Sequence, residues 1–103
     1  MKLVTQEVRK KLPALYSQEK KGDEAIAHVK FFCPWNQWTW YATEFDGEDT
    51  FFGLVVGQET ELGYFSLSEL ESVQGRGFAR GLGIERDLYW TPKTIKEIKK
   101  QQQ

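Results

Sequence analysis

The sequence predicts an α+β fold in a single domain over residues 1–103: an antiparallel sheet of four to five strands in meander order, with short helices packed on one face. Three observations lead to this prediction. Segments of alternating or continuous apolar residues lie between residues 25 and 65, and turn-forming residues separate them. Six of the seven phenylalanines and three of the four tryptophans lie between residues 29 and 73. Helix-capping patterns occur on both sides of this segment.

The N-terminal residues predict one short helix followed by a loop. Thr5 can cap a helix over residues 6–12, and Pro13 ends it because the residue before a proline avoids helical backbone. Residues 17–24 are polar and contain a glycine, which favours a loop. The apolar residues expected to hold this segment on the core are Leu12, Leu15 and Tyr16.

Four strands are predicted, over residues 25–33, 38–45, 51–56 and 61–65. Alternation in the second strand places four residues on one face: Trp38, Trp40, Ala42 and Glu44. The third strand, FFGLVV, is apolar on both faces, so we expect it in the middle of the sheet. Residues 46–49 and 57–60 should form the turns before and after it, because each contains a glycine.

A helix and a glycine-rich loop are predicted after the strands. Ser66 and Glu69 have the spacing of a capping box, and the helix they begin should end near residue 73. Residues 74–83 include four glycines and should form a flexible loop. Phe78 and Leu82 are the residues expected to anchor that loop.

The C-terminal residues predict a short strand and a final helix. Residues 84–90 have the composition of a strand. Thr91 is expected to cap the last helix, with Pro92 as its first residue. Ile95 and Ile98 would form the narrow apolar face of that helix.

The net charge of −1 conceals an uneven distribution of charge. All 14 lysines and arginines lie in residues 1–30 or 76–103, whereas residues 31–75 contain eight acidic residues and no basic one. This acidic segment could imitate nucleic-acid phosphates and occupy a basic groove of a partner protein, or it could be a solvated surface. The acidic turns at 46–49 and 58–61 flank one strand and should lie about 20 Å apart. The acids therefore need not form one patch.

The residues expected to bind a partner protein are Asp46, Glu48, Asp49, Glu59, Glu61 and Trp35. The three acids of the first turn are preferred because they crowd one turn that projects from the sheet. Trp35 lies in a turn and is the tryptophan expected to be exposed, where it would supply an apolar anchor. Together with Trp38 and Trp40 it could instead stack on single-stranded nucleic acid, but no basic residues are interleaved with these rings. Burial of one tryptophan face in the core is the competing interpretation.

The sequence contains no pattern for catalysis, a metal or a cofactor. The only histidine, His28, and the only cysteine, Cys33, are five residues apart on one predicted strand, hence on opposite faces and unable to pair within it. A paired-acid hydrolase would use the abundant carboxylates, but charges in turns are normally solvated. We therefore expect a monomeric, non-enzymatic protein without cofactor or metal. The single cysteine fits a cytoplasmic location, and no apolar run is long enough to span a membrane.

Two runs, PWNQWTWYATEFDG and ELGYFSLSELES, together with GLGIERDLYW, resemble the small bacterial proteins grouped as domain of unknown function 2958. The resemblance extends from Leu12 to Trp90. It implies a gene carried on a plasmid, a conjugative element or a prophage. No catalytic residue is established for the family, so none is carried over. Cys33 stands where many relatives are expected to have threonine, which argues against a shared thiol chemistry.

The chain is also similar in length and motifs to a type II-A anti-CRISPR protein of that family. This similarity implies a small, non-enzymatic inhibitor that binds a type II CRISPR effector nuclease and is encoded on a mobile element. The alternative is a nucleic-acid-binding accessory protein of plasmid or conjugative-element transfer, which would use the basic ends of the chain.

Overall fold

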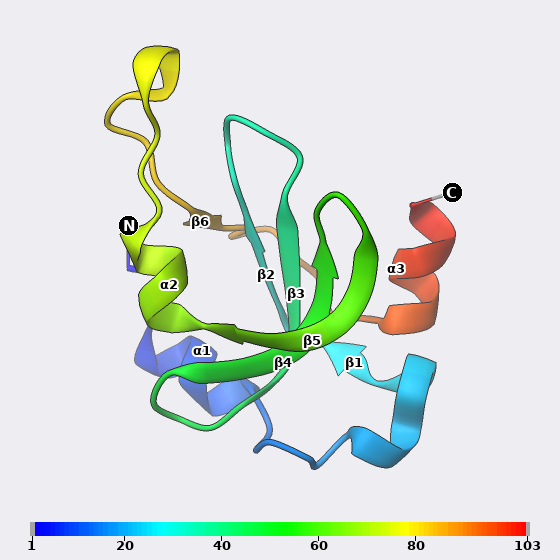
Figure 1. Cartoon of the computed structure of the whole chain (residues 1–103). Helices are drawn as coiled ribbons and strands as arrows, with labels where there is room; N and C mark the ends of the chain where they lie inside the picture. The colour runs from blue at the N-terminus through cyan, green and yellow to red at the C-terminus, as the bar shows by residue number, and fades with distance from the viewer. Residues whose placement is uncertain (1, 103) are drawn as a thin grey trace.

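The protein, described over residues 2–102 of a computed structural model, is built on a five-stranded antiparallel sheet (Figure 1). The strands are β2 (Val29–Phe32), β3 (Thr39–Phe45), β4 (Thr50–Val56), β5 (Thr60–Ser66) and β6 (Glu85–Arg86). Their order, β5-β4-β3-β2-β6, is a meander extended at one edge by β6, and β4 lies inside the sheet as its apolar sequence predicts. A smaller sheet pairs β1 (Ile26–Ala27) with β7 (Lys93–Thr94). The predicted α+β class and meander are confirmed.

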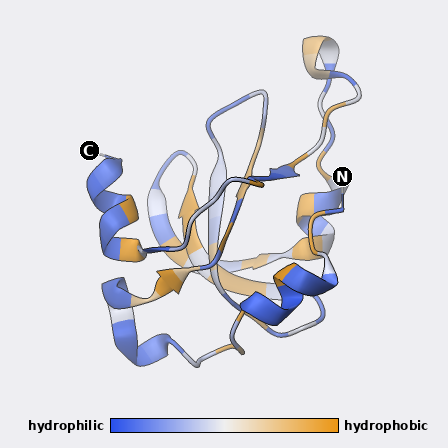
Figure 2. Cartoon of the chain, turned by 180° about the vertical axis from the view of Figure 1, so that it is seen from behind, coloured by the Kyte–Doolittle hydropathy of each residue, from blue (hydrophilic) through white to orange (hydrophobic). Residues whose placement is uncertain are grey.

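Within residues 2–102, three α-helices pack on this sheet: α1 (Gln6–Lys11), α2 (Leu67–Ser72) and α3 (Ile95–Gln101). Two hydrophobic clusters occupy its two faces. The first cluster contains Phe31 and Phe51, and α1 and α2 pack against it. The second contains Leu54, and α3 packs against it. The prediction that the helices pack on one face therefore holds only for α1 and α2. Figure 2 shows the apolar stripe of α3 turned toward the sheet. None of the helices within residues 2–102 has the length and apolar character needed to cross a membrane.

A β-bulge in β3 changes which side chains share a face. The pairing with β4 shifts register between Ala42 and Glu44, so Phe45 joins Ala42 in the first cluster. Glu44 points to the opposite face and is only 3% exposed. The prediction that Glu44 shares a face with Trp40 and Ala42 is wrong, because the extra residue in the bulge reverses the alternation.

The predicted first strand, residues 25–33, is interrupted at His28, and its two halves join different sheets. Every second residue of this segment is buried, but in two different clusters: Ala25 and Ala27 belong to the second cluster, and Val29, Phe31 and Cys33 belong to the first. Near the N-terminus, Thr5 caps α1 by accepting a hydrogen bond from the Val8 N–H. Tyr16, expected in the core, is instead 63% exposed.

The start of the last helix differs from the prediction. Lys93 and Thr94 pair with β1 as β7, which holds the backbone extended past Thr91 and Pro92. Thr94, not Thr91, then caps α3 through a reciprocal capping box with Glu97. The predicted strand over residues 84–90 is reduced to the two residues of β6.

Candidate functional site

The carboxylate of Asp46 builds the β3–β4 turn from inside. Its Oδ1 accepts hydrogen bonds from the backbone N–H groups of Glu48 and Asp49, each at 2.8 Å, and of Thr50 at 3.0 Å. These hydrogen bonds from the backbone lower the pKa of Asp46, and the one from the Glu48 N–H has the largest effect. Asp46 therefore stabilises the turn, and one of its two carboxylate oxygens is already occupied by backbone N–H groups.

Asp49 ties the same turn to the beginning of α2. Its Oδ1 accepts from the Ser68 N–H at 2.8 Å, and its backbone carbonyl accepts from the Leu67 N–H at 2.8 Å. Ser66 caps this helix as predicted, and Asp49 satisfies further N–H groups at a helix end that favours negative charge. Of the three acids in this turn, Glu48 is the one whose side chain no hydrogen bond or ion pair within residues 2–102 engages.

Replacement of Asp46 by asparagine should reduce the loss of stability in acid. Because the pKa of Asp46 is lowered in the folded state, its carboxylate stabilises the fold above the unfolded-state pKa, and this contribution is lost as pH falls through the folded-state pKa. Urea unfolding between about pH 5 and pH 2 should therefore show a weaker pH dependence for Asp46→Asn than for the wild type. Glu48→Gln is the control and should retain the wild-type dependence. Equal pH profiles for wild type and Asp46→Asn would refute this role.

An exposed tryptophan, Trp38, which directly precedes β3, lies beside the second acidic turn. Trp38, Val55, Gln58, Glu59 and Glu61 line one shallow hollow, which we call the Trp38 surface. The indole of Trp38 is held in place by its neighbours while the residue remains 39% exposed. A Cβ at position 57, where the chain has glycine, would lie 2.4 Å from that ring, and the ring of Trp40 lies 5.9 Å away.

The structure separates the residues expected to act together. The turns at 46–49 and 57–60 lie at opposite ends of β4, as expected, so their acids form two sites (Figure 1). Trp35, expected to be the exposed anchor, is half-buried and packs against the first cluster. Trp38 takes the exposed position, next to Glu59 and Glu61. The sequence around Trp35 and Trp38 does not predict which of the two is exposed, because Gly57, which contacts the Trp38 ring, follows the end of β4.

Residues 74–83, which we call the Phe78 loop, project from the sheet beyond α2 (Figures 1 and 2). The buried residue of the loop is Ala79, which is 1% exposed and packs on Gly75. Phe78, expected to be an anchor, is 92% exposed, and Arg76 and Arg80 are exposed on either side of it in sequence. The loop therefore presents an aromatic ring between two basic residues.

Neither the thiol of Cys33 nor the imidazole of His28 is fully exposed to solvent. Cys33 is buried in the first cluster. Burial, with a contribution from the charge of Lys21, lowers the pKa of the half-buried His28. Across residues 2–102, no three histidine, cysteine or acidic side chains gather in a way that could hold a metal ion.

Comparison with known proteins identifies a family for this chain. No curated protein matches the chain, and no solved structure does. The family described as "Protein of unknown function (DUF2958)" matches residues 3–98, which include the whole sheet, α1 and α2 and the beginning of α3. The chain therefore belongs to the DUF2958 family.

Proposed function

We propose that this protein is a small, non-enzymatic inhibitor from a mobile element that binds a type II CRISPR effector nuclease through the Trp38 surface. The choice of partner rests on the similarity in length and motifs to a type II-A anti-CRISPR protein of the family. The choice of surface rests on one observation, the exposed Trp38 ring beside two exposed acids, Glu59 and Glu61.

The physical properties of the Trp38 surface suit a protein partner with a basic groove. Tryptophan is enriched among residues that dominate binding energy, and Trp38 is already fixed in position, so little side-chain freedom is lost on binding. Neither the Glu59 nor the Glu61 carboxylate has a hydrogen-bond or ion-pair partner within residues 2–102. Both are available to steer the approach of a basic surface, and the association should weaken as salt screens them.

The alternative function, nucleic-acid binding, is supported by the Phe78 loop. An exposed aromatic ring with neighbouring arginines can stack on an unpaired base while the guanidinium groups contact phosphates. The lysines of the C-terminal region are less available for this purpose. Lys99 forms an ion pair with Asp23 at 3.0 Å, and the ammonium of Lys93 lies 5.2 Å from the centre of the Trp90 ring.

Two double variants separate these functions. Glu59→Lys with Glu61→Lys reverses the charge of the Trp38 surface, and Arg76→Glu with Phe78→Ala disables the Phe78 loop. Each purified variant is assayed for inhibition of guided DNA cleavage by a type II effector nuclease and for binding of labelled single-stranded DNA. We expect the first variant to lose inhibition by at least about tenfold in effective concentration and the second to retain it.

The matched control is Glu48→Lys with Glu71→Lys, which makes the same change in net charge at exposed acids elsewhere. It should inhibit as the wild type does. Undiminished inhibition by the Glu59→Lys, Glu61→Lys variant would refute the Trp38 surface. Absence of inhibition by the wild type, with DNA binding that depends on Phe78 and Arg76, would support the alternative function instead.

A further inference from the structure

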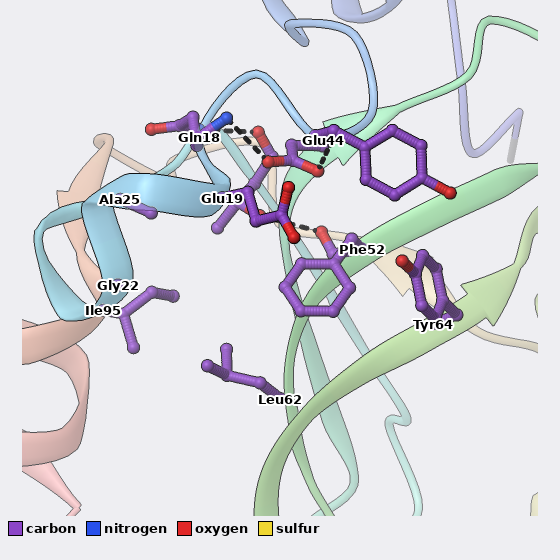
Figure 3. Close-up of a pocket in the computed structure, with 11 residues that line it drawn as sticks. Gln18, Glu19, Gly22, Ala25, Glu44, Phe52, Leu62, Tyr64 and Ile95 are labelled. Carbon is purple, nitrogen blue, oxygen red and sulfur yellow. Dashed lines mark hydrogen bonds between the residues drawn. The ribbon is translucent and has the colours of Figure 1, made fainter.

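A pocket of about 180 Å³ opens on the sheet face that carries the second cluster (Figure 3). It lies between β4 and β5 on one side and the segment around residues 16–25 on the other. The side chains that matter for its chemistry are Tyr16, Glu19, Glu44, Phe52, Leu62 and Tyr64. Figure 3 shows the carboxylates of Glu19 and Glu44 at the top of the pocket and Leu62 at the bottom. None of its lining residues is basic.

Aromatic rings form part of the wall of this pocket. The rings of Phe52 and Tyr64 meet edge to face, with centroids 5.0 Å apart and an interplanar angle of 65°. Tyr16 also lines the pocket, and a hydrogen bond with it raises the pKa of the Tyr64 hydroxyl. The negative charges of Glu19 and Glu44 act in the same direction on that pKa. The pocket thus combines π faces with a negative potential.

Glu44 is directed into the pocket by the bulge in β3. Its Oε1 accepts from the Tyr16 N–H and its Oε2 from the Gln18 N–H, each at 2.8 Å. These two bonds leave lone pairs on the carboxylate, which can accept about four hydrogen bonds. Tyr16 has a positive φ of 70°, which is uncommon for a residue with a side chain, and the bond to Glu44 fixes this backbone. The bulge in β3, the buried carboxylate of Glu44 and the positive-φ backbone of Tyr16 therefore all lie at this one pocket and determine its shape.

We propose that this pocket binds an alkylammonium group, such as the end of a lysine side chain. A cationic nitrogen would lie against the aromatic wall of Phe52 and Tyr64 and donate hydrogen bonds to the Glu44 and Glu19 carboxylates. A buried carboxylate is normally paired with a positive charge, and the pocket supplies none of its own. The site is independent of the proposed function, because Trp38 surface residues Val55 and Glu61 pair on the opposite face of the sheet.

The test is an NMR titration of labelled protein that follows the methyl groups of Leu62 and Ile95. The probes are n-butylammonium, its neutral counterpart 1-butanol, a short peptide with one lysine, and the same peptide with that lysine acetylated. We expect saturable shifts with n-butylammonium and with the lysine peptide, and none with the two neutral probes. Tighter binding of the peptide would identify a protein side chain as the source of the ammonium group, and tighter binding of n-butylammonium a free amine.

Two exposed residues of the pocket provide variants that should fold. Tyr64→Ala should weaken ammonium binding about fivefold by removing a cation–π contact, and Glu19→Gln should weaken it to a similar extent. Tyr89→Ala and Glu48→Gln are the matched controls, because both residues are exposed and lie outside the pocket, and both should bind as the wild type does. The proposal is overturned if n-butylammonium gives no saturable shift, if 1-butanol binds equally well, or if Tyr64→Ala has no effect.

Discussion

Replacement of Leu54 by alanine should destabilise the protein by about 2–5 kcal/mol. Leu54 lies in β4 with no exposed surface, in the second cluster with Tyr41, Ile95 and Ile98. The loss combines the transfer free energy of the deleted methyl groups with the cost of the cavity they leave. Because strands flank β4 on both sides, we expect little relaxation of the backbone to fill that cavity. Urea unfolding followed by circular dichroism measures the change.

Leu62 offers a matched control for this substitution. It pairs directly with Leu54 across the β4–β5 ladder and points to the same face, yet it is 41% exposed. Leu62→Ala should therefore cost less than about 1 kcal/mol. A Leu54→Ala variant that loses no more stability than Leu62→Ala would show that the second cluster contributes little to folding.

Local sequence signals account for most of the fold. The continuous apolar run of β4 predicts its central place, and the caps at Thr5 and Ser66 predict the starts of α1 and α2. Each of these features depends on residues close together in the chain. The prediction for the start of α3 is wrong because that start depends on pairing between β7 and β1, whose residues are far apart in sequence. Thr91, the predicted cap, lies in the segment that precedes β7, and the pairing of β7 with β1 moves the cap to Thr94.

The candidate sites were less predictable from the sequence, because they depend on which polar side chains form hydrogen bonds within the folded chain and which stay free for a partner. The charge pattern marks the acidic turns, but it does not reveal that Asp46 and Asp49 satisfy backbone N–H groups. Nor does it reveal that Trp38, not Trp35, keeps an exposed ring. The pocket depends on a single extra residue in β3, which turns Glu44 away from the face that alternation predicts. A bulge of this kind leaves no signal in its own strand.

The bulge does leave a signal on the neighbouring strand, and Gly53→Ala tests it. A Cβ at position 53 would lie 1.9 Å from the carbonyl oxygen of Tyr41 and 3.0 Å from the Cα of Ala42, so the backbone of β3 would have to move. We expect a loss of about 3 kcal/mol, at the upper end of the usual cost of overpacking a core. Since β3 would be displaced next to its bulge, the position of Glu44 and the hydrogen bond to the Tyr16 N–H should change as well.

Gly63 is the control that separates crowding from the general effect of replacing a glycine. It pairs with Gly53 across the β4–β5 ladder, but a Cβ added at Gly63 would meet nothing within 4 Å, and the φ of this residue is not positive. Gly63→Ala should therefore be neutral or stabilising by about 0.4–1 kcal/mol, because alanine has less freedom to lose on folding. Urea unfolding gives the stability of both variants, and the amide resonance of Tyr16 reports the state of its bond to Glu44. If both alanines are tolerated equally and the Tyr16 resonance is unchanged in both, close contact between β3 and Gly53 does not maintain the bulge.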